Sequence, residues 1–182
     1  VSGDNMEILV KCFGYPINTW NVSGVTSFEN VFSNMGSFNE DLSSWDTSNA
    51  TNLSRMFSRS CQFNQDISKW NTSRVVTMEK MFHNATKFNQ DLSAWDTGSA
   101  TSMAGMFRDA WTFDQSIALW NTCNVQDMSN MFCDARRFNQ GLSKWNPHRV
   151  TGMHQILHTV SENSVKGHMC NQDVLGWDTS NV

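Results

Sequence analysis

The hydrophobic positions of this chain recur as a 25-residue unit. Tryptophan marks the unit most clearly, with six tryptophans in equal steps and a seventh after a longer step: Trp20, Trp45, Trp70, Trp95, Trp120, Trp145 and Trp177. Two phenylalanine columns keep the same register, one through Phe32, Phe57, Phe82, Phe107 and Phe132 and the other through Phe38, Phe63, Phe88, Phe113 and Phe138. A fixed period of this length is typical of a tandem array that buries its apolar residues by stacking one unit on the next.

One half of each unit predicts a short helix. Its apolar residues fall at i, i+3, i+4 and i+7, as in Phe28, Val31, Phe32 and Met35, and this spacing forms one stripe of a helix. The residue before each stripe is of a type that favours helix N-caps, because it satisfies the first free amides. These residues are Ser27, Asn52, Thr77, Ser102, Asp127 and Gly152.

The other half reads D-[LI]-S-x-W, as in residues 66–70, and it is long enough only for a short strand. Strands of successive units would pair in a parallel sheet at about 4.8 Å. The expected fold is therefore α/β, a right-handed leucine-rich-repeat-like solenoid of about seven 25-residue coils, each with a short parallel strand and a short helix. We expect residues 1–182 to form a single repeat domain, with an irregular longer coil at 157–176 that takes the added length before Trp177. The start at Val1 and the unfinished unit after Trp177 predict a piece of a longer chain.

The repeat units resemble those of a known family. The units "FNQDLSAWDTGSATSMAGMF" and "FNQDISKWNTSRVVTMEKMF" closely resemble the BspA-like leucine-rich-repeat surface proteins, a group also described as a domain of unknown function common in mycoplasmal lipoproteins and protists. The resemblance covers about residues 13–182 and departs from the family pattern at both ends. It implies a curved α/β solenoid, a cell-surface or secreted location and binding to proteins or cell-surface ligands. It implies no catalytic residues and no cofactor.

Composition narrows the function classes. The formal net charge of −4 argues against nucleic acid as a partner, because phosphate neutralisation needs clustered Lys and Arg. No apolar run approaches the roughly 20 residues of a membrane span. The five cysteines fall at five different phases of the repeat, which predicts mostly free thiols. These are Cys12, Cys61, Cys123, Cys133 and Cys170.

Several polar columns run through the repeat, and we interpret them mainly as structural. Asp41, Asp66, Asp91 and Asp173 share one phase and could cap turns or, stacked, chelate Ca²⁺; the sequence favours caps. An amide ladder that satisfies backbone groups is predicted at Asn39, Asn64, Asn89, Asn139 and Asn171, with Asp114. The threonine column Thr47, Thr72, Thr97, Thr122 and Thr179 raises an ice-binding alternative, which the lack of a second Thr column disfavours.

Two features break the repeat and are the candidate sites. Trp111 stands at a phase that elsewhere holds Gly36, Cys61, Thr86 and Arg136, and a large aromatic at such a variable position is a contact candidate. The basic residues near it in the repeat complete the candidate binding set of Trp111, Arg108, Arg136 and Arg137. The second feature is a pair of histidines, His154 and His158, four apart on a predicted helix. The pair could hold zinc, but the sequence favours a solvated polar face and predicts no metal site.

These observations favour a non-enzymatic protein-binding or adhesion solenoid that presents an extended surface. The alternative is a structural or scaffold subunit whose open edges are covered by neighbouring subunits of an assembly. An enzyme is disfavoured, because no nucleophile–base pair or phosphate loop stands out, and Gln155 occupies the place where a zinc protease needs its glutamate.

Overall fold

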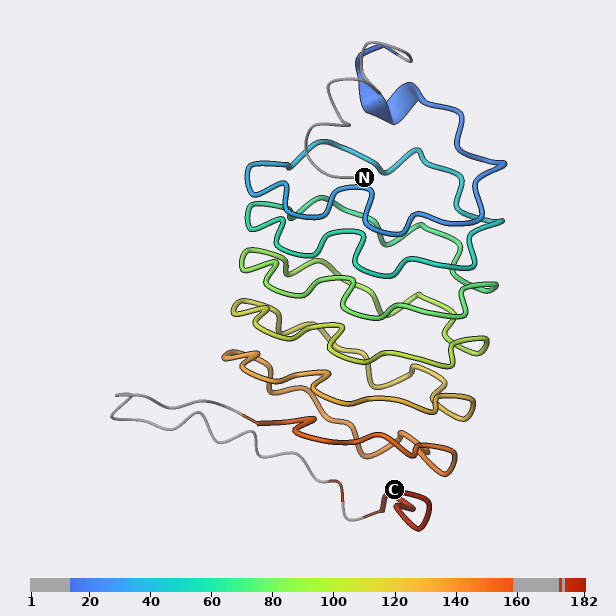
Figure 1. Cartoon of the computed structure of the whole chain (residues 1–182), viewed down its shortest axis with the longest axis vertical. Coiled ribbons are helices and arrows are strands. Elements are labelled where there is room, and N and C mark those ends of the chain that lie inside the picture. Colours follow the sequence, from blue (N-terminus) through green and yellow to red (C-terminus); the bar gives the residue numbers. More distant parts are fainter. Residues whose placement is uncertain (1–13, 159–173, 175) are drawn as a thin grey trace.

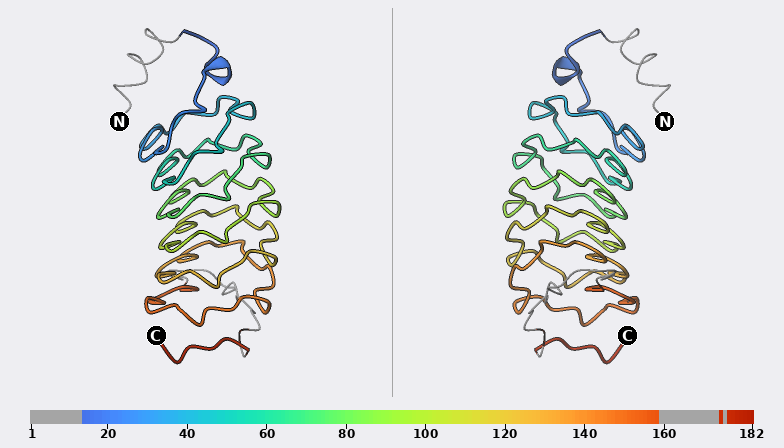
Figure 2. Two further views of the ribbon diagram at one scale, coloured as in Figure 1. Left: turned by 90° about the vertical axis from the view of Figure 1, so that its right-hand side faces the viewer. Right: turned by 90° about the vertical axis from the view of Figure 1, so that its left-hand side faces the viewer.

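The chain winds into a stack of flattened coils, one for each repeat unit (Figure 1, Figure 2). The computed structural model describes residues 14–158, 174 and 176–182. Within these residues the only helix is the short 3-10 helix η1, Ile17–Thr19, and no strand extends beyond an isolated bridge. Parallel bridges join equivalent residues of successive coils: Ser27, Asn52, Thr77, Ser102, Asp127 and Gly152. The period of the sequence is therefore the period of the stack.

The predicted α/β leucine-rich-repeat-like solenoid, with a helix and a strand in every coil, is wrong. Residues 28–35 and their equivalents, which we call the turn segments, are not helical because their amides alternate between two directions. The Phe28 N–H donates to the Asn52 carbonyl of the next coil at 2.8 Å, whereas the Val31 N–H donates back to the Phe28 carbonyl at 3.3 Å. The alternation continues through Met35. A helix would send each of these amides to the carbonyl four residues earlier.

The backbone angles and the coil spacing explain why a helix does not form. Asn30 and Asn34 adopt φ angles of 60° and 62°, and left-handed residues recur at these two phases in the later coils. Such residues interrupt a right-handed helix. Bridged backbones lie about 4.8 Å apart, whereas a helix with its side chains is about 10 Å wide. Each coil is therefore too thin to contain a helix.

The predicted strand at 66–70 is also wrong, because this segment closes a tight turn. The Asp66 carboxylate accepts the Ser68 N–H at 2.9 Å, and the Trp70 N–H donates to the Ile67 carbonyl at 3.1 Å. The equivalent carboxylates of Asp41 and Asp91 accept the Ser43 and Ser93 amides in the same way. These aspartates cap turns, as the sequence favoured.

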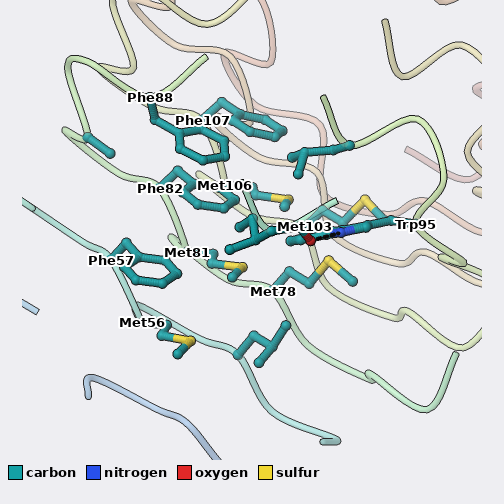
Figure 3. Packing of buried hydrophobic residues seen from close by; sticks show 14 of the residues in the cluster. Met56, Phe57, Met78, Met81, Phe82, Phe88, Trp95, Met103, Met106 and Phe107 are labelled. Carbon is teal, nitrogen blue, oxygen red and sulfur yellow. Dashed lines mark hydrogen bonds between the residues drawn. The ribbon is translucent and has the colours of Figure 1, made fainter. Parts of the chain in front are cut away.

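The apolar stripes nevertheless form the core, although their backbone differs from the predicted one. Methionines and phenylalanines of successive coils lie over one another in the interior (Figure 3). Within a coil the rings of Phe57 and Phe63 stack at 3.8 Å, and between coils the Phe57 and Phe82 rings stack at 5.8 Å. The methionines fill the spaces beside these aromatic columns. Those drawn are Met56, Met78, Met81, Met103 and Met106, and all are fully buried.

The tryptophan column connects each coil to the preceding one. The Trp95 indole N–H donates to the Ile67 carbonyl at 3.1 Å, and the Trp70 indole donates to Leu42 at 3.1 Å. The same bond recurs at Trp45, Trp120, Trp145 and Trp177. In each case the accepting carbonyl lies three residues before the tryptophan of the preceding coil. The tryptophan must therefore stand at one fixed position in each unit to reach that carbonyl.

The other polar columns also serve the backbone. The Asn64 N–H donates to the Asn39 side chain at 2.8 Å and the Asn89 N–H to the Asn64 side chain at 2.8 Å, so the predicted amide ladder is present, although it is partly exposed. Residues predicted as N-caps cap the turn segments instead, as when the Asn52 side chain accepts the Ser54 N–H at 2.8 Å. Thr179 of the threonine column is exposed, but Thr47, Thr72, Thr97 and Thr122 are each only 1% exposed, which contradicts an ice-binding face.

Candidate binding surface

The candidate surface lies where each coil reverses direction after its turn segment. In the fourth coil the Phe113 N–H donates to the Ala110 carbonyl at 3.2 Å, and both residues are fully buried. Trp111, the first central residue of this β-turn, projects outward, whereas the hydroxyl of Thr112, the second, donates to the Thr86 and Phe88 carbonyls of the preceding coil at 2.9 and 3.2 Å. Equivalent turns at 85–88 and 135–138 stack beside it at the left-hand edge of Figure 1. We call this the turn edge, made of residues 33–37, 58–62, 83–87, 108–112 and 133–137.

Trp111 and Arg136 form the centre of the turn edge. Trp111 is 41% exposed, and the Arg136 guanidinium carbon lies 4.3 Å from its ring centroid, in a cation–π contact. Asp134, whose side chain is largely buried, also holds the guanidinium through its Oδ2, at 3.0 Å from Nη2 and 3.3 Å from Nε. The ring and the guanidinium are therefore held in place before any partner arrives.

The structure places the other two predicted binding residues near this pair but in different settings. Arg137 is the exposed second central residue of the same turn as Arg136, and it makes no ion pair with another described residue. Arg108 lies three residues before Trp111, with its Nε 3.4 Å from Oδ2 of Asp109. The shared phase of Trp111 and Arg136 correctly indicated that the two side chains lie close together. The contact of Arg136 with the Asp134 carboxylate was not predicted.

A serine, a histidine and an aspartate also meet on the turn edge, which the sequence reading missed. Ser58 Oγ lies 3.2 Å from His83 Nδ1, and His83 Nε2 lies 3.5 Å from Asp109 Oδ2. Burial lowers the pKa of His83 below its ordinary value, although Asp109 acts in the opposite direction. Ser58 and His83 stand one repeat unit apart, so the shared phase was the available signal.

This group lacks the parts that acyl transfer needs. Ser58 is only 6% exposed. A tetrahedral intermediate also needs free backbone amides near the nucleophile. The amides of Ser58, Arg59 and Ser60 already donate to the carbonyls of Arg55, His83 and Phe57. The group therefore gives no support for hydrolysis.

The candidate metal ligands do not assemble in the described part of the chain. His154 and His158 are exposed and lie on a turn segment rather than a helix, so the helical spacing that was to align their rings does not apply. Among the described residues, no three or more His, Cys, Asp or Glu side chains gather where they could hold a metal ion. The Ser43 amide lowers the pKa of Asp41, as expected for a carboxylate that caps a turn.

The predictions for the cysteines, the irregular coil and a membrane span can be compared only with the residues that the structure describes. Cys61, Cys123 and Cys133 are free thiols, as predicted. Cys12 and Cys170 lie outside the described residues, as does most of the predicted irregular coil at 157–176. No helix in the described part of the chain is long and apolar enough to cross a membrane.

Comparison with known proteins places the chain in a family but does not assign it a function. The chain matches no curated protein and no solved structure. Neither the backbone nor any match supports the leucine-rich-repeat, BspA-like, adhesion and cell-surface description drawn from the repeat units. Two overlapping segments, residues 5–117 and 59–168, match one family pattern and together span most of the chain. The chain therefore belongs to the family described as Mycoplasma protein of unknown function, DUF285.

Proposed function

We propose that this chain is a non-enzymatic protein-binding module that presents the turn edge to other polypeptides. The observation that carries the proposal is the exposed Trp111 ring held by Arg136 and Asp134. Tryptophan and arginine supply much of the binding energy at protein interfaces, and a side chain that is already fixed loses little conformational entropy on binding. Stacked coils support such a side chain on an extended surface.

A display selection tests the proposal without assuming a partner. A random-peptide library is selected against the wild-type protein, and the recovered peptides are then compared on wild type, Trp111→Ala and Leu119→Ala. Leu119 is a matched control, because it is 74% exposed and lies outside the turn edge. We expect peptides whose affinity falls about tenfold or more in Trp111→Ala and hardly changes in Leu119→Ala. Peptides that bind all three proteins equally would refute the proposal.

A structural subunit of a larger assembly is the second candidate, and a different observation favours it. An apolar cavity of about 320 Å³ lies at the first coil, lined chiefly by Trp20, Val22, Val25, Phe28 and Val31. Accessible apolar surface of this kind is suited to a neighbouring subunit. Purification of the protein with a fixed set of partners would favour this function, whereas a monomer that binds peptides through Trp111 would favour the first.

A narrower relationship to the BspA-like surface proteins rests on the repeat units alone, and the binding proposal does not depend on it.

A further inference from the structure

The turn edge carries positive charge on an otherwise acidic chain. It holds five of the 13 Lys and Arg residues but only two of the 17 Asp and Glu residues, and the formal net charge of the chain is −4. The cations are Arg59, Lys87, Arg108, Arg136 and Arg137, and the two acids are Asp109 and Asp134. A local excess of one sign attracts a partner of the opposite sign.

Both carboxylates of the edge already have cationic partners. Asp134 holds Arg136, and Asp109 contacts Arg108. The remaining cations, Arg59, Lys87 and Arg137, are exposed and form no ion pair with any described residue. Charges left unpaired on one edge favour complementary carboxylates on a partner.

The unpaired cations lie on both sides of the exposed aromatic ring. Lys87 belongs to the β-turn one coil before that of Trp111, and Arg137 belongs to the turn one coil after it. A partner that satisfies this edge therefore needs negative charge on both sides of an apolar group. Asp109 and Asp134 would repel a uniformly charged polyanion, whereas a polypeptide can place neutral residues opposite them.

Accepting that the edge binds polypeptides as proposed above, we infer that its partner is an acidic segment with an aromatic residue among its carboxylates. The aromatic residue packs on the free side of Trp111, and the carboxylates pair with Lys87 and Arg137. Such pairs lie at the rim of the contact, so they contribute to association rate and specificity and weaken with salt.

Fluorescence anisotropy with defined probes tests this inference. The first probe is a fluorescein-labelled peptide of alternating Glu and Tyr, and the second has Lys in place of Glu. We expect the Glu–Tyr peptide to bind, and its affinity to fall about tenfold in the double variant Lys87→Glu/Arg137→Glu. The matched control is Lys69→Glu/Lys144→Glu, which makes the same change in net charge at two exposed lysines outside the turn edge. We expect the control to stay within about twofold of wild type.

The other outcomes separate this inference from the proposed function. Equal, Trp111-dependent binding of the Lys–Tyr peptide would overturn the charge inference and leave the binding function standing. The charge inference would also fail alone if the Glu–Tyr peptide did not bind while displayed peptides bound through Trp111. An equal loss in both double variants would mean that net charge, not the edge, attracts the probe. Heparin is the remaining competitor. If it displaced the Glu–Tyr peptide and bound the same residues more tightly, the partner would be a sulfated polysaccharide and the inference would be wrong. The absence of any Trp111-dependent peptide, displayed or defined, would remove both proposals.

Discussion

Replacing Trp95 with phenylalanine tests whether the indole bonds hold the coils together. The Trp95 side chain is only 3% exposed, and its N–H satisfies the Ile67 carbonyl of the preceding coil at 3.1 Å. Phenylalanine keeps an aromatic ring but removes the indole donor. The Ile67 carbonyl keeps the bond from the Trp70 N–H, so the loss of its second bond costs about 1 kcal/mol. The smaller ring leaves a void that costs about 1 kcal/mol more. We expect the free energy of unfolding to fall by about 2 kcal/mol.

The same substitution at Trp111 is the control, because that ring is exposed and its indole makes no hydrogen bond with another described residue. Surface changes of this kind usually cost under about 0.5 kcal/mol. Guanidinium unfolding followed by near-ultraviolet circular dichroism measures both variants, and unchanged slopes would show that the two states are comparable. If Trp95→Phe and Trp111→Phe have equal, small effects, the indole bonds do not contribute as described.

Two further predictions concern His83 and Gly152. Burial holds the pKa of His83 below its ordinary value of 6.5, so at mildly acidic pH the unfolded chain binds more protons. The free energy of unfolding should therefore fall as the pH drops below about 6.5, and denaturation of His83→Asn across this range should show a shallower slope than wild type; an unchanged slope would contradict this. A Cβ at Gly152 would lie 2.5 Å from the Asp127 carboxylate, whereas one at Gly36 meets no atom within 4 Å. Thermal melting should therefore show Gly152→Ala destabilised by about 1–2 kcal/mol and Gly36→Ala nearly unchanged; equal melting would refute the reasoning.

The sequence was informative about which side chains are buried and less so about the backbone that carries them. Spacing at i, i+3, i+4 and i+7 correctly identified core residues such as Phe28 and Phe32. Alternating turns bury residues at the same spacing as a helix, so the spacing does not distinguish the two backbones. One signal was available. Asn30 and Asn34, which share a turn segment, belong to a type that tolerates left-handed φ angles and forms helices poorly. The arginines at the equivalent places in the next coil, Arg55 and Arg59, obscured it.

The candidate surface followed more directly from the period. Residues one repeat unit apart lie over one another, so the contact between Trp111 and Arg136 could be expected before any coordinates were known. Asp134 could not, because its approach to Arg136 depends on how the turn segment bends. The expected alignment of His154 and His158 on a helix was wrong, because alternating turns do not align side chains at i and i+4 as one helical turn does.

The bond between Trp177 and the stack shows which part of a unit can change length. The interval from Trp145 to Trp177 is longer than the period of the repeat, yet the Trp177 ring stacks on Trp145 at 6.1 Å and its indole N–H reaches the Leu142 carbonyl at 3.0 Å. The position of a coil is therefore set by its contacts with the coil beneath it, not by the length of chain that leads to it. Whole units can be duplicated or lost without new contacts having to arise, and residues added between the columns leave the framework unchanged. Such insertions are places where members of one family can diverge in what they bind while they keep the same core.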